Sequence, residues 1–541
     1  MNTNDSSNGV FDVAIVGYGP TGLALAYWLG KAGHKTVVIE RWPDLYTLPR
    51  AGHVDGEVMR LFQKMGVAET IERDSAEMKV AIVKGVDGEE IMRAFAEESD
   101  QGWRPRYSLY QPNLEQALDA VVRDTGHVTI LQGWLAESIE KCGKDGARIQ
   151  IASGSASNGN WTPTGLQRTI AARWMIGADG ANSIVRKFLP SAVLDLGYQA
   201  RALVIFAERL DPKVGEAMPD TEIAMVLPRP YVAFRESGKR FARWEFNVSD
   251  NESSAEMSTA EKAWELIGPW GFTPGNSRLV RHSVFEFRTQ VVESWRDGNI
   301  LLAGDAAHVM PPFQGQGMCS GQRDAAALAW RLDLVMRGIA DAALLDSYTD
   351  ERKPHVIELT KNASERGRTF WITDPDKARE RDARMREGLV SDNVKKRAGL
   401  IPPLVDGFLM RGSDGVVLPA GRLSAQFPVR HSGRKALLDE FVGANWLLLS
   451  ADRSLLQLLG AEERELLRLL DARIILLGRS DTHDEFEDID GKYATWLRGI
   501  GWQLVLIRPD SYIFGGASEA NGMHVLFESL RAQLHLKVDA A

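Results

Sequence analysis

The chain has 541 residues, of which 44% are hydrophobic and 25% are charged. These values exclude a peptide hormone, a fibre and a disordered tail, and the length predicts about three domains. The formal net charge is −9 and the chain contains no long basic run, so nucleic acid is not an expected partner.

Cysteine usage and apolar runs bear on the cellular setting. The two cysteines, Cys142 and Cys319, form no CxxC pattern. Neither a disulfide framework nor a zinc site is therefore expected, and a reducing, cytoplasmic location is predicted. The first ten residues lack the pattern of a secretory leader. The strongest apolar run, Ile300–Met310, is too short to span a bilayer and contains Asp305, so we expect no membrane partner.

The first predicted elements form a βαβ unit. Strand-like apolar runs at Phe11–Val16 and Thr36–Ile39 flank a helical pattern over Leu23–Ala32. The turn between the first strand and the helix is the glycine-rich segment Gly17–Gly22, and Glu40 follows the second strand. This arrangement is typical of a dinucleotide-binding domain.

The three glycines of the turn have separate physical roles. Gly17 permits the tight turn, Gly19 lets a pyrophosphate approach the backbone, and Gly22 packs the helix against the strand. The helix N-terminus offers partial positive charge to the phosphates, and Glu40 can accept the ribose hydroxyls of an adenosine. At this point the nucleotide could be NAD or FAD.

Further along the chain the predicted secondary structure changes twice. A helix is predicted over Pro112–Asp124 and strands over Val128–Leu131 and Ala171–Ile176. Between Ala202 and Phe287 short β-like runs dominate, with one helix near Thr259–Ile267, and they predict an antiparallel sheet in a second domain. The runs are Leu203–Ala207, Ile223–Leu227, Tyr231–Phe234, Phe241–Phe246 and Leu279–Phe287.

The last third returns to buried-strand and helical patterns. A strand is predicted at Asn299–Ala303, then long helices over Gly317–Met336 and Ala342–Phe370, the second kinked at Pro354. Gly399–Pro428 is rich in glycine and proline and predicts a linker. Beyond it, strands are expected at Trp446–Leu449, Arg473–Leu477 and Gln503–Ile507, with a closing helix near Met523–Leu534.

The segment after the late strand favours FAD over a nicotinamide dinucleotide. Asp305 offers a carboxylate to a polyol chain, and the glycine-rich start of the following helix can stabilise an anionic ring. Here the sequence resembles the class A flavoprotein aromatic hydroxylases, the family of p-hydroxybenzoate hydroxylase and phenol hydroxylase, and most of all the 3-(3-hydroxyphenyl)propionate hydroxylase type. The motifs are GYGPTGL (Gly17–Leu23), Glu40, Pro49–Ala51, Gln111–Pro112, GADGANSIVRK (Gly177–Lys187), LLAGDAAHVMPPFQGQG (Leu301–Gly317), YTDER (Tyr348–Arg352) and Arg508–Asp510.

The resemblance implies a set of cofactor contacts. The glycine turn and Glu40 would hold the ADP half of FAD, Arg50 and Gln111 its middle, and Asp305 its ribityl chain. Asp179 would lie beside the pyrophosphate and help with NADH or NADPH. The full set is Gly17, Gly19, Pro20, Thr21, Gly22, Glu40, Arg41, Arg50, Gln111, Asp179, Gly180, Gly304, Asp305, Pro312, Gly315, Gly317 and Met318.

The chemistry that the resemblance implies is oxygen transfer to a phenol. Reduced flavin and O2 would form a C4a-hydroperoxide, which attacks an electron-rich ring carbon. Asp55 is the carboxylate placed to interact with the substrate hydroxyl, and His53 is the alternative proton acceptor. Asp55 equally suits the N-cap of the helical run Val58–Met65.

Other polar residues receive weaker assignments. Tyr231, on a strand expected to face the pocket, and Pro312 are predicted to contact substrate. Arg229, Arg235 and Arg243 could bind a substrate carboxylate, although a solvated β-face is their default. His308 is expected to be an orienting hydrogen-bond partner. Cys319 replaces an Asn found in many relatives, and a small buried role is favoured for it.

The predicted fold class is α/β, with a Rossmann-like FAD-binding domain interleaved with an antiparallel-sheet substrate domain. The FAD domain takes residues 1–75, 105–190 and 290–400, and the substrate domain takes 76–104 and 191–289. Residues 415–541 resemble a thioredoxin-like domain without CxxC, which cannot exchange disulfides. A small phenolic substrate is the expected partner, and a homodimer is left open.

The sequence predicts an FAD-dependent monooxygenase that consumes NADH or NADPH and O2 and hydroxylates 3-(3-hydroxyphenyl)propionate or another substituted phenol. Alternatives on the same scaffold are a Baeyer–Villiger oxygenase and a polyketide-tailoring hydroxylase. A non-catalytic flavin-binding sensor is the alternative from another class, and a plain NAD-dependent dehydrogenase is disfavoured by the Asp305 motif.

Overall fold

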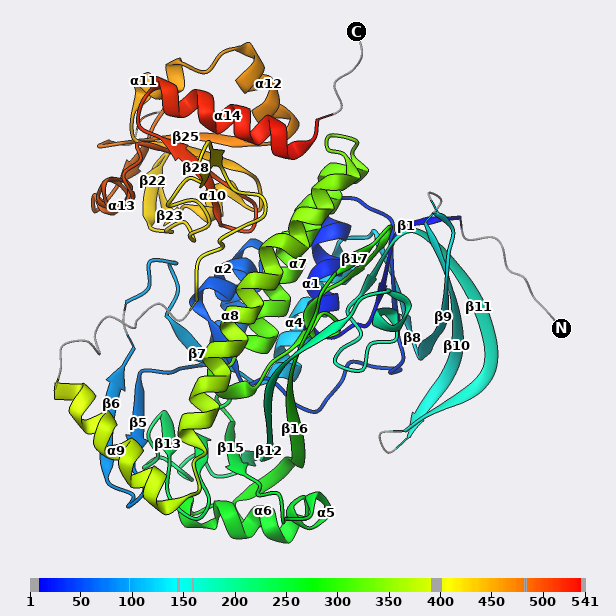
Figure 1. The fold of residues 1–541 in the computed structure, drawn as a ribbon, viewed down its shortest axis with the longest axis vertical. Coiled ribbons are helices and arrows are strands. Elements are labelled where there is room, and N and C mark those ends of the chain that lie inside the picture. The colour runs from blue at the N-terminus through cyan, green and yellow to red at the C-terminus, as the bar shows by residue number, and fades with distance from the viewer. Residues whose placement is uncertain are drawn as a thin grey trace.

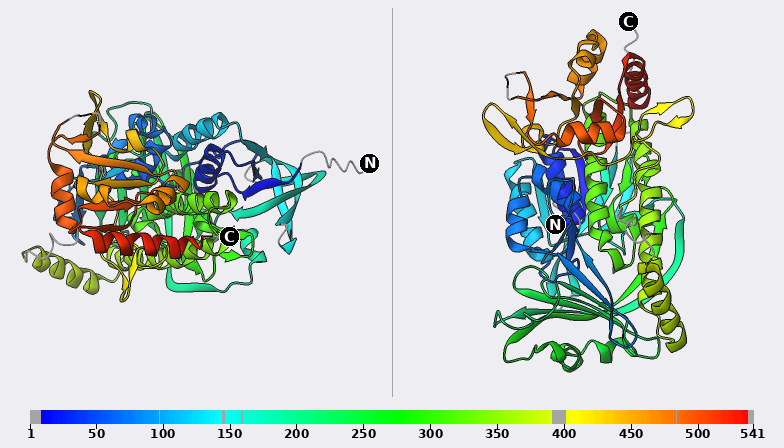
Figure 2. Two further views of the ribbon diagram at one scale, coloured as in Figure 1. Left: turned by 90° about the horizontal axis from the view of Figure 1, so that it is seen from above. Right: turned by 90° about the vertical axis from the view of Figure 1, so that its left-hand side faces the viewer.

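The computed structural model describes residues 9–96, 98–143, 146–157, 160–390, 401–480, 482 and 484–536. Three large sheets follow one another along the long axis of the molecule, as the side view in Figure 2 shows. The glycine-turn sheet lies in the middle, the second sheet lies at one end, and the sheet built by the C-terminal segment lies at the other. The two ends of the chain therefore contribute to different layers.

The middle sheet has the strand order β17-β18-β11-β1-β2-β8. Its central strands pair in parallel, and β1 and β2 are almost completely buried, as expected for a sheet covered on both faces. The strands are β1 (Phe11–Val16), β2 (Thr36–Glu40), β8 (Val128–Gln132), β11 (Asn160–Gly177), β17 (Arg296–Asp297) and β18 (Ile300–Leu302).

Helices from distant segments cover this sheet. α1 (Pro20–Lys31) packs against both α4 (Gln111–Asp124) and α7 (Gln316–Met336). Pro20 stands in the first turn of α1, where its missing N–H costs no hydrogen bond, so the helix begins three residues earlier than its periodicity predicts. α8 (Asp346–Phe370) follows the 3-10 turn η6 (Ala342–Leu345) and contains Pro354.

An antiparallel extension of the middle sheet was not predicted. β9 (Trp134–Lys141) and β10 (Ala147–Ser157) pair with each other, and β10 pairs with β11. Figure 1 shows these strands projecting beyond the helical layer. The predicted strand Ala171–Ile176 is only the last part of β11, because the exposed polar residues before it hide its strand character.

The second sheet confirms the antiparallel sheet expected for the middle of the chain. Its order is β19-β16-β12-β15-β14-β13-β5-β6, and every neighbouring pair is antiparallel except β13 and β5. The 80–95 region thus joins the strands after residue 190. The strands are β5 (Val80–Lys84), β6 (Glu90–Phe95), β12 (Val193–Arg209), β13 (Thr221–Ala224), β14 (Tyr231–Phe234), β15 (Phe241–Asn247), β16 (Ser277–Val292) and β19 (His308–Val309).

Short helices and a small sheet complete this region. α6 (Ala260–Ile267) and η3 (Gly268–Trp270) pack on the face of the second sheet that carries Trp244, and α9 (Pro375–Val390) runs beside β6. A small three-stranded sheet has the order β3-β7-β4, and its strands come from the part of the sequence between β2 and β8. Its strands and the nearby helices are β3 (His53–Asp55), α2 (Gly56–Lys64), α3 (Ala68–Asp74), β4 (Ala76–Glu77), β7 (Arg106–Ser108) and α5 (Ser254–Met257).

The C-terminal segment builds a seven-stranded sheet of order β23-β22-β26-β25-β24-β27-β28. β24 and β25 are parallel, whereas β27 is antiparallel to both β24 and β28. The elements are β22 (Pro428–His431), β23 (Arg434–Leu437), α10 (Asp439–Val442), β24 (Leu447–Ser450), α11 (Arg453–Gln457), α12 (Ala461–Leu469), β25 (Arg473–Gly478), β26 (Phe486–Asp488), α13 (Lys492–Ile500), β27 (Leu504–Ile507), β28 (Ile513–Ala517) and α14 (Ala520–Leu534).

The predicted linker is corrected by the structure. Residues 399–400 lie outside the described part, but the rest of Gly399–Pro428 packs into the protein. Leu404, Phe408 and Leu409 are buried in one cluster with Trp330 of α7 and Trp446. A short hairpin of β20 (Arg411–Gly412) and β21 (Gly415–Val416) follows. The glycines and prolines therefore mark turns in a core segment.

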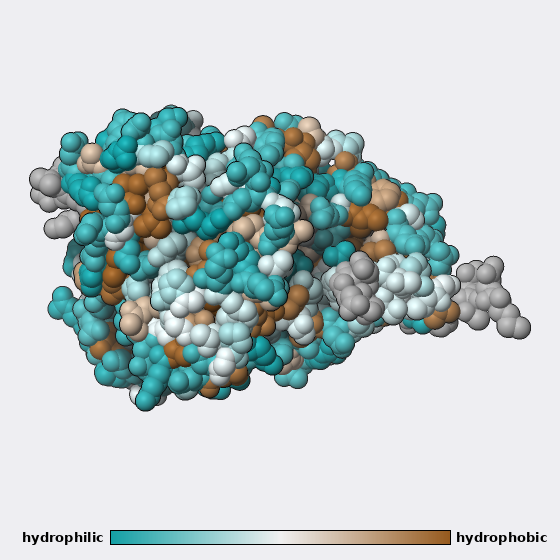
Figure 3. Space-filling view, turned by 90° about the horizontal axis from the view of Figure 1, so that it is seen from below, coloured by the Kyte–Doolittle hydropathy of each residue, from teal (hydrophilic) through white to brown (hydrophobic). Residues whose placement is uncertain are grey.

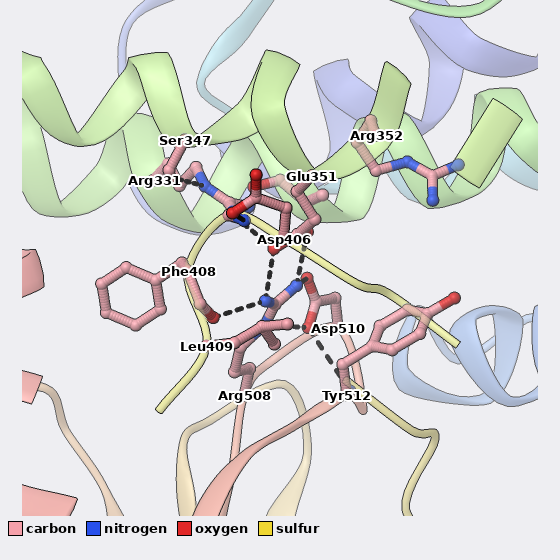
Figure 4. A network of polar contacts seen from close by, with 12 residues as sticks. Arg331, Ser347, Glu351, Arg352, Asp406, Phe408, Leu409, Arg508, Asp510 and Tyr512 are labelled. Atoms are coloured by element: carbon pink, nitrogen blue, oxygen red, sulfur yellow. Dashed lines mark hydrogen bonds and ion pairs between the residues drawn. The ribbon is translucent and has the colours of Figure 1, made fainter. Parts of the chain in front are cut away.

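Buried ion pairs join the C-terminal sheet to the helices of the middle layer. Arg508 donates to both carboxylate oxygens of Glu351 on α8, at 2.6 and 2.7 Å, and also pairs with Asp510. Arg331 of α7 donates to the same Glu351 at 2.8 Å. Figure 4 shows Arg508 between the two carboxylates, and all four side chains are buried.

The exterior is mainly polar. Figure 3, which views the end formed by the second sheet, shows hydrophilic residues over most of the face and apolar residues in scattered patches. None of the helices in the described ranges combines the length and apolar character that a membrane span requires.

Candidate active site

A cavity of about 490 Å³ lies where the middle sheet meets the second sheet. One part of its wall consists of the glycine turn after β1 and the end of β2. Another part consists of the loop after β18 and the start of α7, and a third is the inner face of β13, β14 and β15. The parallel strands of the middle sheet thus present their carboxyl ends to the cavity, the edge at which such sheets bind ligands.

The glycine turn has the geometry that its three predicted roles require. Gly17 has φ +103°, and a Cβ there would overlap the backbone of Ala178. A Cβ on Gly22 would overlap the carbonyl oxygen of Gly17, so this position brings helix and strand together. Around Gly19, by contrast, no atom lies within 4 Å of a Cβ position. Gly19 lines the cavity, and its backbone is open to a ligand.

Glu40 stands at the end of β2 with its carboxylate held in the cavity wall. Its two oxygens accept hydrogen bonds from the backbone N–H groups of Tyr18 and Trp42, at 2.8 and 2.9 Å. The guanidinium of the neighbouring Arg41 lies 5.1 Å from the ring centroid of Trp42. This carboxylate is fixed in place and retains lone pairs that can accept ribose hydroxyls.

The side chain of Gln111 contacts the backbone of Arg50. The side-chain oxygen of Gln111 accepts hydrogen bonds from the N–H groups of Arg50 and Ala51, at 3.0 and 2.6 Å. Gln111 donates in turn to Glu115 at 2.6 Å. The guanidinium of Arg50 is exposed and lies 4.6 Å from the ring centroid of Tyr46. Gln111 therefore shapes the loop, while Arg50 stays available to a ligand.

Asp305 presents a carboxylate to the cavity without a partner in the described part of the protein. It lies in the 3-10 turn η4 (Gly304–Ala306). Its side chain is exposed in the open cavity, but protein surrounds it on several sides, and the resulting partial desolvation raises the pKa of Asp305. Thr21 packs against this turn, because a Cβ on Gly304 would lie 2.6 Å from the Thr21 hydroxyl oxygen.

A buried ion pair fixes the Asp305 turn from behind. Asp324 accepts hydrogen bonds from the backbone N–H of Gly304 at 3.0 Å and from Arg352 at 2.9 Å, and it lies 2.6 Å from His308 Nε2. Burial acts to raise the pKa of Asp324, but His308 and Arg352 outweigh it and hold the pKa at about 2. His308 is thus an orienting partner, as predicted, and lies behind the cavity wall.

The N-terminus of α7 opens onto the cavity. The turn η5 (Pro312–Gln314) leads into Gly315, which has φ +68°, and Pro312, Gly315, Gly317 and Met318 line the cavity. No side chain caps the first turn of α7, so its backbone N–H groups are free to meet an anionic ring edge. Cys319 is fully buried and lies outside the lining, which fits the small buried role expected for it.

Asp179 and Gly180 lie at the end of β11, and both line the cavity. The carboxylate of Asp179 accepts hydrogen bonds from the Ser183 hydroxyl at 2.5 Å and from the Ile184 and Val185 backbone N–H groups. It thereby caps the turn η2 (Val185–Phe188). Burial still raises the pKa of Asp179 despite these donors.

Together these groups fit an FAD molecule. The unfilled space at Gly19 suits a pyrophosphate, the fixed Glu40 suits a ribose, and the unpartnered Asp305 suits a polyol. The uncapped α7 N-terminus suits the pyrimidine edge of a flavin. All predicted cofactor residues except Gly22 and Gly304 line the cavity, and those two pack the loops that do.

The inner face of the second sheet forms the opposite wall. Residues that alternate along the strands point into the cavity, as the pleat dictates. Those residues are Thr221, Ile223, Val232, Phe234, Arg243 and Glu245.

Tyr231 is a correction to the predicted substrate wall, because it lies on the other face of the same strand. Its hydroxyl donates to Glu222 at 2.5 Å, and its ring packs 5.1 Å from Trp270. The run Tyr231–Phe234 correctly predicts the strand, but the sequence does not indicate which of the two sets of alternating side chains faces the cavity.

The two predicted acid–base residues lie within 4.8 Å of each other, but only one of them reaches the cavity. Asp55 caps α2 by accepting from Val58 N–H at 3.2 Å, and it also accepts from Gln316 at 3.1 Å and Arg323 at 2.9 Å. It lies outside the cavity lining. His53 lines the cavity, and its Nε2 has no hydrogen-bond partner. Burial, reinforced by Arg106, lowers the pKa of His53 to about 3, so its imidazole is neutral.

The three arginines considered for a substrate carboxylate all have acidic partners. Arg229 pairs with Glu252 and Arg235 with Asp220, and neither arginine lines the cavity. Arg243 does line it but pairs with Glu245 at 2.5 Å. Sequence reasoning missed Arg106 and Arg366, which also line the cavity. No motif surrounds them, and only the tertiary fold brings them together.

Comparisons with known proteins agree with this geometry. Residues 10–363 match the family model described as "FAD binding domain", and residues 421–533 match the model described as "HcaD C-terminal domain". A relative from Rhodococcus jostii (strain RHA1), named probable NADH-specific resorcinol 4-hydroxylase, is 34% identical over 96% of this chain and 94% of its own.

A second relative and two solved structures extend the comparison. The 3-(3-hydroxy-phenyl)propionate/3-hydroxycinnamic acid hydroxylase 1 of Burkholderia vietnamiensis (strain G4 / LMG 22486) is 29% identical over 94% of this chain and 89% of its own. The flavin-dependent monooxygenase PieE has a TM-score of 0.78 at 20% identity, covering 98% of this chain and 99% of its own. Aklavinone-11 hydroxylase has a TM-score of 0.77 at 23% identity, covering 99% and 100%.

The two structures share the fold of this chain, and the family model and the Rhodococcus relative each span well over half of it. The protein therefore belongs to the FAD-binding family of class A flavin monooxygenases, enzymes that hydroxylate phenolic rings with FAD and a reduced nicotinamide cofactor.

Proposed function

We propose that this protein hydroxylates a small one-ring phenol, of the resorcinol or 3-(3-hydroxyphenyl)propionate kind, with NADH as the reductant. One observation carries the proposal. A single cavity runs from the unpartnered Asp305 and the α7 N-terminus to the apolar face of Val232 and Phe234. Cofactor and ring would thus share one enclosed space. The names of the two relatives favour these substrates and, for the Rhodococcus relative, NADH.

Bound FAD would accept two electrons from NADH and activate O2, so that one oxygen atom enters the ring and the other leaves as water. The chain would hold it by the groups described above. Gly19 and the α1 N-terminus would meet the pyrophosphate, Glu40 the adenosine ribose, Arg41 and Arg50 the middle, and Asp305 the ribityl chain. Pro312, Gly315, Gly317 and Met318 would lie around the ring.

We propose that His53 accepts a hydrogen bond from the hydroxyl group of the substrate. Its neutral imidazole faces the cavity beside Gly315, and its Nε2 is without a partner. Asp55 is already engaged by Arg323, Gln316 and Val58, so we propose that it positions the start of α7 and the β3 strand that carries His53.

We propose further that residues 415–541 form a thioredoxin-like domain. The order β25-β24-β27-β28, with one parallel and two antiparallel pairs and α14 closing the motif, supports this. Sheet membership likewise supports a substrate domain of 76–104 and 191–289 set within an FAD domain of 1–75, 105–190 and 290–400. A homodimer and a cytoplasmic location stay predictions.

The test is a coupled assay on the purified flavoprotein. Resorcinol and 3-(3-hydroxyphenyl)propionate are each supplied with NADH or NADPH, and 3-phenylpropionate, which lacks the phenol, serves as the control. Consumed nicotinamide, hydrogen peroxide and hydroxylated product are all measured. The proposal expects close to one product per NADH for at least one phenol and none for the control. Oxidation of NADH that yields only peroxide with every phenol would overturn it.

A further inference from the structure

Two half-buried arginines in the cavity wall have no acidic partner among the described residues. Arg106 on β7 and Arg366 on α8 both line the cavity. Within the described part of the chain, neither guanidinium takes part in a hydrogen bond or an ion pair. Arg243, on the same cavity, is neutralised by Glu245 at 2.5 Å. Arg41 and Arg50 also line the cavity without an acidic partner, but both are exposed and lie over aromatic rings. Arg106 and Arg366 differ from them because they are half-buried.

Their surroundings make these charges costly to leave unpaired. Burial lowers the pKa of both arginines, and the charge of Arg106 lowers the pKa of Arg366 further. Asp55 attracts Arg106 electrostatically, but it forms its ion pair with Arg323 instead. An arginine stays protonated at any physiological pH, so a bound anion would balance the positive charges that the protein leaves unpaired.

Arg106 and Arg366 stand beside the residues proposed to meet the substrate. Arg106 is opposite Asp55 in the β3–β7 pair, two residues from His53, and Arg366 precedes Gly367, which packs against Phe313. Arg106 is the strongest charged influence on the pKa of His53, the residue that faces the cavity beside Gly315. Phe313 and Phe370 line the same cavity and supply apolar surface. Cationic donors beside aromatic surface match a ring that carries an anionic oxygen, since a guanidinium can hold a carboxylate with two parallel hydrogen bonds.

We propose that Arg106 and Arg366 form a subsite for an anionic oxygen of the aromatic substrate, either a carboxylate on its side chain or a ring phenolate. The inference rests on the proposed phenol hydroxylation and narrows its substrate class to aromatic anions. The subsite is separate from the groups assigned to the FAD pyrophosphate, which lie at the glycine turn.

The experiment is equilibrium titration of the FAD holoenzyme without NADH, followed by the change in flavin absorbance. The carboxylate arm compares 3-phenylpropionate with the neutral 3-phenylpropanol. The phenolate arm compares 4-nitrophenol above and below its own pKa. The variants are R106Q and R366Q, with R106K and R366K as charge-retaining forms. Matched controls are R104Q and R368Q, because Arg104 and Arg368 lie two residues away, are exposed and pair with Glu77 and Glu365.

The wild type should prefer the anion in at least one arm by tenfold or more. That preference should fall about tenfold to a hundredfold in R106Q and R366Q, the loss expected for one charged hydrogen bond. The lysine forms should recover part of it, and the controls should match the wild type. Flavin content and thermal midpoint, measured on every variant, separate a local loss from misfolding.

Three results would overturn the subsite. One is a wild type without anion preference in either arm, and another is a preference that survives in both glutamine variants. The third is a loss of bound FAD in those variants, which would assign the arginines to the cofactor. Failure of the proposed function looks different: anions would bind tightly at this site, yet no phenol would yield product with NADH.

Discussion

At the scale of single residues, similar carboxylates have different roles because their partners differ. Asp324 is buried and fully engaged by His308, Arg352 and the Gly304 backbone. Asp179 caps a turn. Asp305 alone of the three faces the cavity with no donor from the described residues, and desolvation by the surrounding cavity wall raises its pKa. Such a carboxylate is stabilised when a ligand hydroxyl reaches it.

Replacing Asp305 with Asn should weaken FAD binding about tenfold or more, because a neutral amide accepts hydrogen bonds from ribityl hydroxyls less strongly than a carboxylate. The measurement is the dissociation constant of FAD from the apoprotein by fluorescence. Asp376→Asn, which changes an exposed aspartate on α9, should leave that constant unchanged. An Asp305→Asn protein that retains FAD as tightly as the wild type would remove Asp305 from the cofactor site.

The lowered pKa of His53 predicts that the stability of the folded protein depends on pH. Its pKa is about 3 in the folded protein and near 6.5 when unfolded, so the unfolded chain binds more protons between these values. Stability that is present above pH 6.5 is therefore lost as the pH falls. From pH 7.5 to pH 5.0 the apoprotein should lose about 2 kcal/mol more unfolding free energy than His53→Gln.

Urea unfolding at the two pH values measures this difference. Exposed His524 provides the control, and His524→Gln should lose as much stability on acidification as the wild type. Equal losses in the wild type and His53→Gln would show that His53 is not buried as a neutral group.

Sequence reasoning found the cofactor residues because each belongs to a motif whose spacing reflects its chemistry. Gly19 and Asp305 are examples. It could not find Arg106 or Arg366, which stand in ordinary contexts 260 positions apart and line one cavity only in the folded chain. Nor could it decide the direction of Tyr231, since a strand offers two faces and only packing chooses between them.

At the scale of elements, the loops that end parallel strands create the site. The turn between β1 and α1 shows this most clearly, because its glycines differ in what surrounds them. Gly22 is in contact with the Gly17 carbonyl, whereas Gly19 has open space and an extended backbone, with φ −76° and ψ −174°. Alanine fits the backbone at Gly19, but its methyl group would occupy the space that we propose for the FAD pyrophosphate.

Gly19→Ala should therefore leave the thermal midpoint of the apoprotein within about a degree of the wild type and weaken FAD binding at least tenfold. Calorimetry of the apoprotein and flavin titration measure the two quantities. Gly22→Ala is the matched contrast, because its overlap with backbone should destabilise the protein itself. Normal FAD affinity in Gly19→Ala would mean that the pyrophosphate does not lie against this turn.

Element prediction succeeded where one periodicity dominates. The buried runs of β1 and β2 and the long helix α7 are found to within a few residues. The sequence does not predict the β9–β10–β11 extension, because its residues are largely exposed and polar and their hydrophobic alternation is weak. Glycine and proline predict a linker after residue 400, but the apolar side chains of this segment are buried in the core, which composition does not show.

At the scale of the whole molecule, the C-terminal sheet is held to the flavin-binding layer by buried charges. Arg508 bridges Glu351 and Asp510 (Figure 4), and Tyr512 donates to Glu57 at 3.2 Å. Glu57 pairs with Arg323, which also pairs with Asp55. Contacts thus continue from the C-terminal sheet to the residues that position the start of α7. The Arg508–Asp510 motif is visible in the sequence, but its partner Glu351 lies 157 positions away.

Arg508→Met should lower the free energy of unfolding by about 3–5 kcal/mol, because Glu351 and Asp510 would stay buried without their main cation. Arg430→Met is the matched control within the same sheet. Arg430 also pairs with a glutamate, Glu487, but is 40% exposed, so about 0–1 kcal/mol is expected. Denaturant unfolding of both variants gives the comparison, and similar small losses would show that the interface does not depend on Arg508.

The central claim, that one cavity brings bound flavin and a phenol together for oxygen transfer, is tested most directly by a single turnover. Holoenzyme reduced with one equivalent of NADH is mixed with resorcinol or 3-(3-hydroxyphenyl)propionate and oxygenated buffer, and hydroxylated product is counted per flavin. The account predicts close to one product per flavin with at least one of these phenols. Full reoxidation of the flavin with only hydrogen peroxide as product, for both, would contradict it.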